Sequence, residues 1–588
     1  MTPTARPTRS ARLVAFSSLI ALGACSLPAP TPNDLVAAPG KRVEGTKGMV
    51  AASSPEAAAA GAEILRAGGN AADAAVATAF ALSVTDVSQT GLGGGGALTF
   101  YDARAKRADH LSFYPRTGSD PRWAENPGPA AQRAPGTAAA VPGMVAGLLE
   151  THRRFGRLPR AQVMAPAIRL ARDGFVVTPL LSRTITSSRA RLEVDPDAKR
   201  TFLPTGEPLR PGDRLVQPVL AATLERIAAD GNAAFYQGDI AVRLAAKVQA
   251  QGGFITAEDM GRFPVLAGAP LCAAWHGHTV LTAPPPVGGA PVLAMLQMAE
   301  AAGLTRAGGF SSEPEAVATL AGVLRTAQAD AGWWRGDPTK MAVPARGVSS
   351  AGYAKARAAE LTAPVRDTVA VGDPWSHETD ALPAGCTGPA YPSATRGPDS
   401  APPTRDLEDA GSFTSHLAVV DADGNAVSAT TTVGVLFGSG VYTDGFFLNS
   451  SNANMDARTR GVERYTNSTI APTIILDRGA VRLVIGAAGS QYIQPAITQV
   501  ALRILAFGED PGRAISAPRI QTTPTRREVE VEPGFTPSVY AGLVARGYVP
   551  VSRVGDIQFG GIHGVYVRRD GLRIGIADPR RDGVAVRQ

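Results

Sequence analysis

The chain has 588 residues, of which 44% are hydrophobic and 19% are charged, and its formal net charge at pH 7 is +7. This composition can bury a large core and excludes a disordered or fibrous chain. Lysine and arginine are scattered along the sequence, so the excess of positive charge predicts a mildly basic surface and no nucleic-acid partner.

The beginning of the chain is typical of an exported protein. Three arginines among the first 12 residues are followed by the apolar stretch LVAFSSLIALGA, which is too short to span a bilayer as a helix. The stretch ends in LGAC, which resembles a bacterial lipobox and makes Cys25 the predicted lipidation site. We therefore expect a signal peptide over residues 1–24, a tether over residues 25–47 and a lipid anchor to the cell envelope in the periplasm. A plain cleaved signal, giving a soluble periplasmic or secreted protein, is the alternative.

Two alanine-rich helices are predicted over residues 48–83. Ser54 is placed to cap the first helix, with Pro55 at its first position. Asn70 is placed to cap the second helix, and Asp73 follows three residues later. The abundance of alanine predicts that both helices pack closely against a flat surface.

A β-hairpin is predicted next, in the stretch GALTFYDARAKRADHLSFY. It follows the sequence GLGGGG at residues 91–96, which lacks the lysine of a phosphate-binding loop. The order of elements around these glycines is also wrong for a dinucleotide-binding fingerprint. We interpret them as positions where two backbones approach closely.

The middle of the chain changes from helical to irregular. Residues 135–260 are predicted to be mostly helical, with a strand at residues 278–283 and further helices at residues 290–303 and 315–334. From residue 364 to residue 412 the hydrophobic periodicity is lost, and proline, glycine, serine and aspartate are frequent. A stretch of this length without predicted elements is unusual inside a compact domain and indicates a special role.

The pattern changes to strands after residue 412. HLAVVD and AVSATTTV, joined by the turn ADGN, predict a hairpin. Further strands are predicted in APTIILD, AVRLVIG, REVEVE, GGIHGVYVRR and GLRIGIAD, with a helix in QPAITQVALRILAFG. This order of helices and strands predicts an α+β fold in which layered sheets are covered by helices on both sides.

No metal ion or cofactor is predicted. His276 and His278 are close together, but no carboxylate or cysteine pattern accompanies them. DADGN lacks the glutamate spacing of a calcium loop. No GxSxG elbow occurs between a predicted strand and a predicted helix, so an α/β-hydrolase is not supported.

The cysteines beyond the lipobox leave two possibilities open. Only Cys272 and Cys386 remain, and in an exported protein they could form a disulfide. They are far apart in the sequence, which does not show whether they meet. A disulfide and a pair of free thiols are both compatible with the sequence.

Thr414 lies where the irregular stretch ends and the strand pattern begins. A threonine hydroxyl is a poor nucleophile without an adjacent base, but an N-terminal threonine has its own α-amino group as that base. The α-amino pKa is ordinarily about 7.7–8.0, so part of the group is neutral near pH 7. An internal threonine gains this base only if the peptide bond before it is cut. The local pattern alone does not distinguish this role from that of an ordinary threonine before a strand.

The chain resembles the gamma-glutamyltranspeptidase family from about residue 47 to its end. The matching stretches occur in the order of the family, namely GMVAASSPEAAAAGAEILRAGGNAADAAVA, GLGGGGALTFYDA, VPGMVAGLLETHRRFGRLP, APAIRLARDGF, APPPVGGAPVLAMLQ, TSHLAVVDADGNAVSATTT and FGSG. The resemblance implies an N-terminal-nucleophile hydrolase fold, an αββα four-layer sandwich. It also implies self-cleavage into a large subunit (residues 48–413, with the loop-rich segment 364–413 at its end) and a small subunit (residues 414–588). The two would share one core and stay together as a heterodimer.

The resemblance implies how the nucleophile is made. FTSH matches the family's cleavage site, so the bond between Phe413 and Thr414 would be cut. Thr414 would attack the Phe413 carbonyl to give an ester that water hydrolyses, and the freed Thr414 would then attack substrate amides. Thr432 matches a supporting threonine that hydrogen-bonds the nucleophile.

Other residues of the substrate site follow from the same resemblance. GAAGSQ is similar to the family's paired-glycine loop, whose backbone N–H groups form the oxyanion hole, and Ala488 and Gly489 fall there. An alanine can serve as a backbone donor if its φ angle is negative. Ser468 and Thr469 match paired serines that contact the substrate carboxylate.

The chain departs from the family pattern where glutamate would be recognised. Tyr114 stands where the family has an arginine that binds the α-carboxylate, and Arg116 follows two residues later. Gly434 replaces an asparagine, and Asn454 replaces the acidic group that binds the α-amino group. Each lost hydrogen bond to a charged group of the substrate would weaken binding by about 1.5–3 kcal/mol. Arg116 or Asp456 would compensate if a shifted geometry brought it to the substrate. The short chain between Asp456 and Ser468 also predicts a reduced lid and an open site.

Three hypotheses follow. The first is a self-processing gamma-glutamyltransferase or hydrolase that acts on glutathione-like amides, with water, an amino acid or a peptide as acceptor. The second is an amidase or acylase of the same family with a preference for a non-glutamyl acyl group, which the departures at Tyr114, Gly434 and Asn454 favour. The third is a non-catalytic envelope lipoprotein, which the presence of Thr414 and Thr432 disfavours.

Overall fold

The computed structural model describes residues 40–125, 134–306, 312–386, 391–396, 413–456, 458–553, 557 and 559–588. The predicted signal peptide, Cys25 and most of the predicted tether lie outside the described residues. Within the described part of the chain, no helix combines the length and the apolar character needed to cross a membrane.

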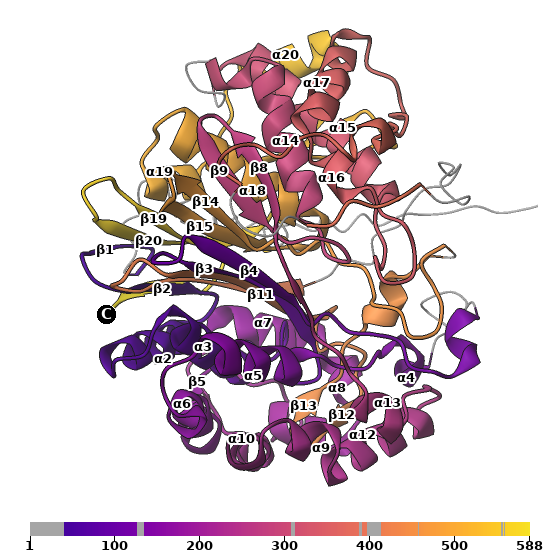
Figure 1. The fold of residues 1–588 in the computed structure, drawn as a ribbon. Helices are drawn as coiled ribbons and strands as arrows, with labels where there is room; N and C mark the ends of the chain where they lie inside the picture. The colour runs from indigo at the N-terminus through magenta and orange to yellow at the C-terminus, as the bar shows by residue number, and fades with distance from the viewer. Residues whose placement is uncertain are drawn as a thin grey trace, which may run out of the picture.

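Two seven-stranded antiparallel sheets stack face to face at the centre of the molecule (Figure 1). Sheet I contains, in spatial order, β1 (Arg42–Gly45), β20 (Arg573–Ala577), β19 (Gly561–Val567), β15 (Ala480–Ala488), β14 (Thr473–Asp477), β9 (His278–Thr282) and β8 (Leu271–Trp275). Sheet II contains β21 (Val584–Arg587), β2 (Met49–Ala52), β10 (Phe413–Val420), β11 (Ala426–Gly434), β3 (Gly95–Asp102), β4 (Arg107–Ser112) and β7 (Leu266–Gly268). Small aliphatic side chains such as Ala418, Ile474 and Val484 fill the layer between the sheets.

The order of strands in each sheet mixes segments from before and after Thr414. In sheet II, β10 and β11 lie between β2 and β3, which both precede Thr414 in the sequence. In sheet I, the four adjacent strands β20, β19, β15 and β14 follow Thr414, while β1 and the pair β9 and β8 precede it. A cut before Thr414 would therefore leave two chains that share both sheets and their core.

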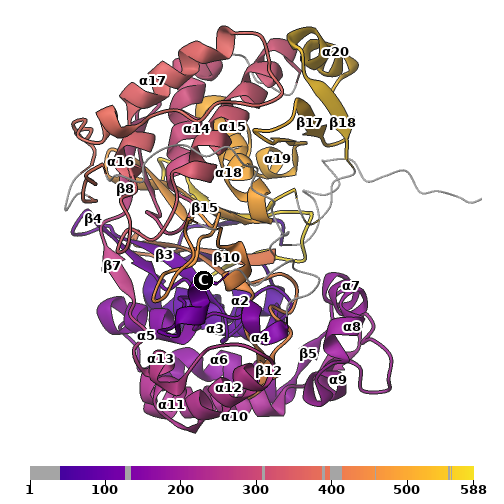
Figure 2. The same ribbon diagram turned by 90° about the vertical axis from the view of Figure 1, so that its right-hand side faces the viewer.

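One helix layer covers the outer face of sheet II, with smaller helices beyond it (Figure 1). These helices are α2 (Pro55–Arg66), α3 (Ala71–Thr85), α4 (Pro135–Ala138), α5 (Met144–Phe155), α6 (Arg160–Asp173), α7 (Pro179–Ser187), α8 (Arg189–Leu192), α9 (Pro196–Phe202), α10 (Pro218–Asp230), α11 (Asn232–Tyr236), α12 (Asp239–Ala250) and α13 (Ala257–Gly261). Figure 2 shows α7, α8 and α9 as a group to one side of α10–α12.

The other helix layer covers the outer face of sheet I and completes the predicted αββα order. It contains α14 (Ala290–Ala301), α15 (Pro314–Trp333), α16 (Ala345–Val348), α17 (Ala351–Ala359), α18 (Ile493–Ala501), α19 (Pro511–Ser516) and α20 (Pro537–Arg546). A small sheet of β16 (Ile520–Thr522), β17 (Glu528–Val531) and β18 (Val549–Ser552) lies at its edge. Two strand pairs lie apart from the main sheets, β5 (Phe175–Val176) with β6 (Arg214–Leu215) and β12 (Tyr442–Thr443) with β13 (Phe446–Phe447).

The predicted helix caps and hairpins are confirmed. The Ser54 hydroxyl accepts the N–H of Ala57, and Asn70 and Asp73 form a capping box at the start of α3. Every residue of α3 is buried, because its alanines allow it to lie flat between sheet II and α6. The two predicted hairpins are β3–β4 and β10–β11.

The described part of the loop-rich segment 364–413 has little regular secondary structure, but it is bound to the rest of the protein by specific contacts. Cys386 forms a disulfide with Cys272 on the edge strand β8, which resolves the question that the sequence left open. Glu378 is 2% exposed, and its carboxylate accepts one backbone N–H at each oxygen. Residues 397–412, which lead into the predicted cleavage site, lie outside the described residues.

Candidate active site

Thr414 lies at an irregularity in the central hairpin of sheet II. Phe413 pairs with Gly434 and Ser415 pairs with Thr431, so two residues of β11 face the single residue Thr414 on β10. Such β-bulges bend a strand and redirect side chains, often next to active sites. Thr414 is 1% exposed in this uncut chain, and β10 packs against β15 of the other sheet.

The hydroxyl of Thr432 contacts the peptide bond that is predicted to be cut. Its Oγ1 donates to the carbonyl oxygen of Phe413 at 2.6 Å and accepts the N–H of Gly434 at 2.7 Å. The N–H orients the hydroxyl so that its proton points at the carbonyl. A donor at this oxygen stabilises the negative charge that develops when a nucleophile attacks the Phe413 carbon.

The glycine-rich loop before β3 packs against the backbone of β11. A Cβ atom at Gly94 would lie 2.2 Å from the carbonyl oxygen of Thr432, and one at Gly96 would lie 2.5 Å from that of Thr430. A Cβ atom at Gly93 would lie 2.3 Å from the oxygen of Phe447. The prediction that these glycines allow close backbone approach is confirmed, and their contact with Thr432 shows why the loop adjoins the site.

A local contact explains why position 434 is a glycine, where the resemblance implies an asparagine. Its φ angle is +91°, and an added Cβ atom would lie 2.2 Å from Oγ of Ser450. That hydroxyl accepts the N–H of Val435 at 3.1 Å, so Ser450 occupies the space and takes a local hydrogen bond.

We expect Gly434→Asn to destabilise the protein by about 1–3 kcal/mol, because it combines left-handed strain with a clash against Ser450. The loss is measured by chemical denaturation. Gly424→Asn is the matched control: its φ angle is +87°, but an added Cβ atom would meet the Cβ of Ala103 at an ordinary 3.5 Å. Equal losses in the two variants would show that the clash with Ser450 contributes nothing.

The turn after β15, where the resemblance implies an oxyanion loop at Ala488 and Gly489, has two consecutive positive φ angles that begin one residue later. Ala488 is the last residue of β15 and pairs with Gly561, and it has no positive φ angle. The two residues with positive φ angles are Gly489 at 131° and Ser490 at 54°. A paired-glycine loop therefore corresponds better to Gly489 and Ser490 than to Ala488 and Gly489.

Thr469 joins this turn to the segment that was predicted to bind the substrate carboxylate. Its Oγ1 donates to the carbonyl oxygen of Ser490 at 2.9 Å. The neighbouring Ser468 accepts the N–H of Ile470 and donates its own N–H to the carbonyl oxygen of Pro286, both at 3.3 Å. The structure thus brings residues 468–469 and 489–490 together.

The residues predicted to replace the glutamate clamp have other contacts. The Arg116 guanidinium lies 3.8 Å from the Glu463 carboxylate and 5.9 Å from the centre of the Tyr465 ring. The Asp456 carboxylate accepts from Thr459 and lies 3.5 Å from Arg335.

The remaining two residues of the predicted clamp lie in different surroundings. Tyr114 is 1% exposed, and Asn454 is half-buried at the end of a short 3-10 helix, Ser451–Asn454. The segment before Ser468 is tied down, because the Thr117 hydroxyl donates to the Gly461 oxygen and the Asp337 carboxylate accepts the N–H of Tyr465. An open substrate site stays a prediction, since part of the neighbouring chain lies outside the described residues.

A buried polar group beside the nucleophile was not predicted from the sequence. Asp86, at the end of α3, accepts from the Ser415 hydroxyl at 2.5 Å and from the Gln89 amide at 2.7 Å. Burial raises the pKa of Asp86 to about 7, against the opposing effects of the Ser415 hydrogen bond and the positive charge of Arg581. In the sequence Asp86 is only an aspartate after a helix, so no local pattern could have indicated it.

Two buried histidines near the hairpin are held neutral. His416, which follows the cleavage-site residues, contacts the Thr430 hydroxyl through Nδ1 at 2.8 Å. Burial lowers the pKa of His416 to about 3 and holds the pKa of His563 well below its ordinary value. Neither side chain changes charge near neutral pH.

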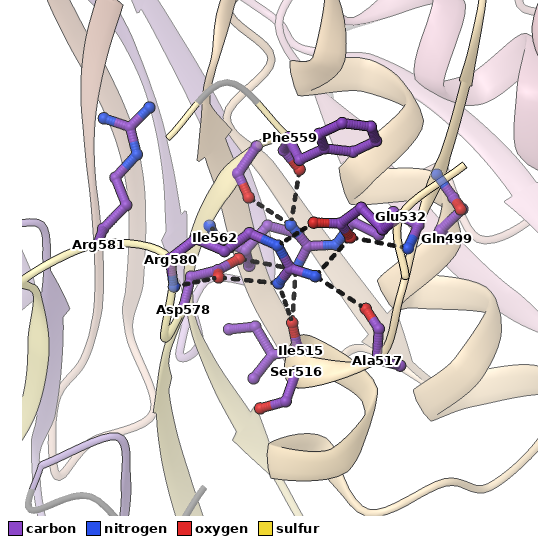
Figure 3. A network of polar contacts seen from close by, with 12 residues as sticks. Gln499, Ile515, Ser516, Ala517, Glu532, Phe559, Ile562, Asp578, Arg580 and Arg581 are labelled. Carbon is purple, nitrogen blue, oxygen red and sulfur yellow. Dashed lines mark hydrogen bonds and ion pairs between the residues drawn. The ribbon is translucent and has the colours of Figure 1, made fainter. Parts of the chain in front are cut away.

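A cluster of buried charges fixes the C-terminal segment next to this site (Figure 3). Asp578 lies 2.7 Å from Arg519 and 3.0 Å from Arg580, and Arg580 lies 2.6 Å from Glu532. Figure 3 shows that the next side chain, Arg581, points away from this cluster. The cluster therefore anchors the backbone from which Arg581 extends toward the loop after α3.

Among the described residues, no three histidine, cysteine, aspartate or glutamate side chains are grouped so that they could hold a metal ion. The described groups around Thr414 are hydroxyls, backbone N–H donors and the Asp86 carboxylate.

The fold and this site together define an N-terminal-nucleophile hydrolase: an αββα sandwich with a hydroxyl residue at the start of a central strand. The chain belongs to the gamma-glutamyltranspeptidase family, whose model, described as "Gamma-glutamyltranspeptidase", matches residues 57–587. It is 33% identical to the "Acylase ACY 1 proenzyme" of Pseudomonas sp. (strain V22), over 93% of this chain and 94% of that protein. It is 31% identical to the "Glutathione hydrolase proenzyme" of Bacillus subtilis (strain 168), over 92% of each.

Among solved structures, cephalosporin acylase from Bacillus halodurans is similar to this chain with a TM-score of 0.79. The two are 25% identical, and the match covers 98% of this chain and 99% of that one. The relatives thus have names from both the glutathione hydrolase and the acylase branches of the family.

Proposed function

We propose that the protein is a self-processing enzyme that cuts its own chain between Phe413 and Thr414 and then transfers acyl groups from amides through an acyl-threonine intermediate. The observation that carries this proposal is the hydrogen bond from Thr432 to the Phe413 carbonyl, directly before a buried threonine at a β-bulge. The proenzyme names of the two curated relatives support it.

Self-cleavage begins when Oγ of Thr414 attacks the carbonyl carbon of Phe413. The bond from this carbon to the Thr414 nitrogen breaks, the nitrogen takes up the proton that Oγ loses, and an ester between Phe413 and Oγ remains. Water hydrolyses the ester, which leaves a Phe413 carboxylate and a free Thr414 with its α-amino group. The small subunit (residues 414–588) and the large subunit (predicted as residues 48–413) stay associated, because their strands are interleaved in both sheets. The large subunit would also include β1 (Arg42–Gly45), which lies in the stretch predicted as tether.

In the reaction with substrate, the Thr414 α-amino group takes the proton of Oγ as the oxygen attacks the amide carbonyl. The same proton passes to the leaving amine, and the acyl group remains on Oγ. Backbone N–H groups of the turn at Gly489 and Ser490 bind the developing oxyanion. Water, an amino acid or a peptide then accepts the acyl group.

Amides of γ-glutamyl compounds such as glutathione are the first substrate candidates, since family members include glutathione hydrolases. A second candidate is an amide with another acyl group. It is favoured by the engagement of Arg116 with Glu463, by the engagement of Asp456 with Arg335, and by Gly434. These contacts occupy the charged groups that could otherwise replace a glutamate clamp.

A pair of matched anilides tests the acyl preference. γ-Glutamyl anilide and glutaryl anilide differ only in the α-amino group, so the ratio of their kcat/KM values measures recognition of that group. A ratio above 1 supports the γ-glutamyl candidate, and a ratio below 1 supports the other acyl group. Absence of turnover of both anilides by a cut and folded protein would contradict the enzymatic proposal and favour a binding role.

We further propose export and lipid anchoring through Cys25, with a periplasmic location. The Cys272–Cys386 disulfide supports an oxidising compartment. Mass analysis of the protein isolated from the envelope tests this: a mature chain that starts at an acylated Cys25 is expected. A mature chain that starts elsewhere and carries no lipid would support the plain cleaved signal instead.

A further inference from the structure

The loop after α3 holds both strands of the hairpin at the point where Thr414 and Thr432 face each other. On β10, the Ser415 hydroxyl donates to Oδ2 of Asp86 at 2.5 Å. On β11, the N–H of Val433 donates to the carbonyl oxygen of Gln89 at 3.0 Å. The loop therefore contacts the residue after Thr414 and the residue after Thr432.

This loop is itself held in one orientation. The Gln89 amide donates to Oδ1 of Asp86 at 2.7 Å, and its oxygen accepts from the Arg581 guanidinium. Arg581 also donates to the carbonyl oxygen of Ile557 at 2.5 Å. Because Arg581 occupies the Gln89 oxygen, the amide cannot turn over to present an acceptor to Asp86.

We propose that Asp86 is a positioning residue for self-cleavage, and that its ionised carboxylate holds Ser415 and Gln89 so that Thr414 stays aligned with the Phe413 carbonyl. This inference rests on the proposed self-cleavage. The ionised carboxylate accepts from both donors. Protonation turns one oxygen into a donor, so on Oδ2 it would reverse the hydrogen bond with the Ser415 hydroxyl, and on Oδ1 it would set two donors against each other at Gln89. Asp86 acts through both Ser415 and Gln89 and is not assigned contact with the reacting atoms.

The surroundings of Asp86 allow it to respond to pH. The charged groups around it are Arg581 and Asp582 from the C-terminal segment, together with Glu56 of α2, which lines the same small cavity. This cavity of about 20 Å³ borders Asp86 and has room for one water molecule. Burial raises the pKa of Asp86 to about 7, so the carboxylate changes charge in the neutral range.

During self-cleavage, the titration of Asp86 can be measured without that of the catalytic base. Before the cut, Thr414 is part of a peptide bond and has no α-amino group to titrate. The neighbouring His416 and His563 are neutral throughout the neutral range. The rate of self-cleavage is therefore expected to rise with pH to a plateau, with a midpoint near pH 7.

The test is the pH profile of self-cleavage of full-length precursor, made by cell-free synthesis in the cold and transferred to buffers between pH 5.5 and pH 8.5. The fraction of cut chain is followed on denaturing gels. Asp86→Asn is expected to remove the rise with pH and to lower the plateau rate about tenfold, since the amide NH2 group cannot accept the hydrogen bond that one end of the carboxylate accepts. Ser415→Ala is expected to move the midpoint to higher pH, because it removes a hydrogen bond that lowers the pKa of Asp86.

Asp73→Asn is the matched control, since Asp73 is a fully buried carboxylate at the other end of α3. It is expected to leave the midpoint unchanged even if it lowers Tm. Asp86→Asn is not expected to lower Tm at pH 8, because a raised folded pKa means that the ionised form costs folding free energy. An unchanged wild-type midpoint in both Asp86→Asn and Ser415→Ala would overturn the inference while leaving self-cleavage intact. A wild-type precursor that stays uncut at every pH would overturn the inference and the proposed function together.

Discussion

Thr414→Ala is expected to leave a single uncut chain, whereas the wild-type protein is expected to yield two chains, the smaller beginning at Thr414. Alanine has no hydroxyl to attack the Phe413 carbonyl, and in the uncut chain the position is 1% exposed, so water alone cannot readily replace it. Mass analysis under denaturing conditions measures both outcomes. Thr414→Ser is the matched variant, because it retains the hydroxyl and is expected to be cut.

The same mass analysis distinguishes the role of Thr414 as nucleophile from the supporting role of Thr432. Thr432→Val keeps the shape of the side chain but removes both the donor to Phe413 and the acceptor for the Gly434 N–H. Loss of a hydrogen bond to a developing oxyanion typically lowers a rate about 10²–10³-fold, so slow cutting is expected, and Thr432→Ser is expected to restore it. A Thr414→Ala chain that is still cut at the same bond, or a Thr432→Val chain that is cut at the wild-type rate, would contradict the roles proposed here.

The main elements of the fold could be predicted because their signals are local. The caps of α2 and α3 and the turns of the two hairpins are each encoded within a few residues, and the structure has them where they were predicted. The order of strands within the sheets depends on contacts between distant segments, such as β10 beside β2. The family resemblance supplied the αββα layers and favoured Thr414 as the nucleophile, but the order of strands was not predicted.

The parts of the site that could not be predicted depend on backbone angles and on partners far away in the sequence. The family resemblance placed the oxyanion loop at Ala488 and Gly489, but the positive φ angles occur at Gly489 and Ser490. Gly434 looked like a lost substrate contact, and the structure shows that Ser450 occupies its side-chain space. Asp86 is next to Ser415 only because α3 ends beneath the hairpin, and no sequence pattern contains that fact.

Asp578→Asn is expected to be the most destabilising single substitution in the C-terminal segment, with a loss of about 3–5 kcal/mol. Asp578 is fully buried between Arg519 and Arg580, and it also accepts the N–H of Ile562 at 3.1 Å. Removing its charge leaves two guanidinium groups with less compensation in a buried site. The free energy of unfolding is best measured by denaturant titration of the uncut Thr414→Ala chain, so that unfolding involves one polypeptide.

An exposed ion pair and the pH dependence test whether the stabilising effect of Asp578 comes from its buried position and not from its charge alone. Asp570 pairs with Arg568 at 2.6 Å, but both side chains are more than half exposed, so Asp570→Asn is expected to cost less than about 1 kcal/mol.

Burial by itself would raise the pKa of Asp578, but Arg519 and Arg580 outweigh it and hold the pKa below its ordinary value. A lowered folded pKa means that this contribution is complete above the unfolded pKa of about 3.9 and is lost as the pH falls further. The difference between wild type and Asp578→Asn should therefore shrink below about pH 4. Equal losses for Asp578→Asn and Asp570→Asn at pH 7 would show that the buried cluster does not hold the segment that carries Arg581.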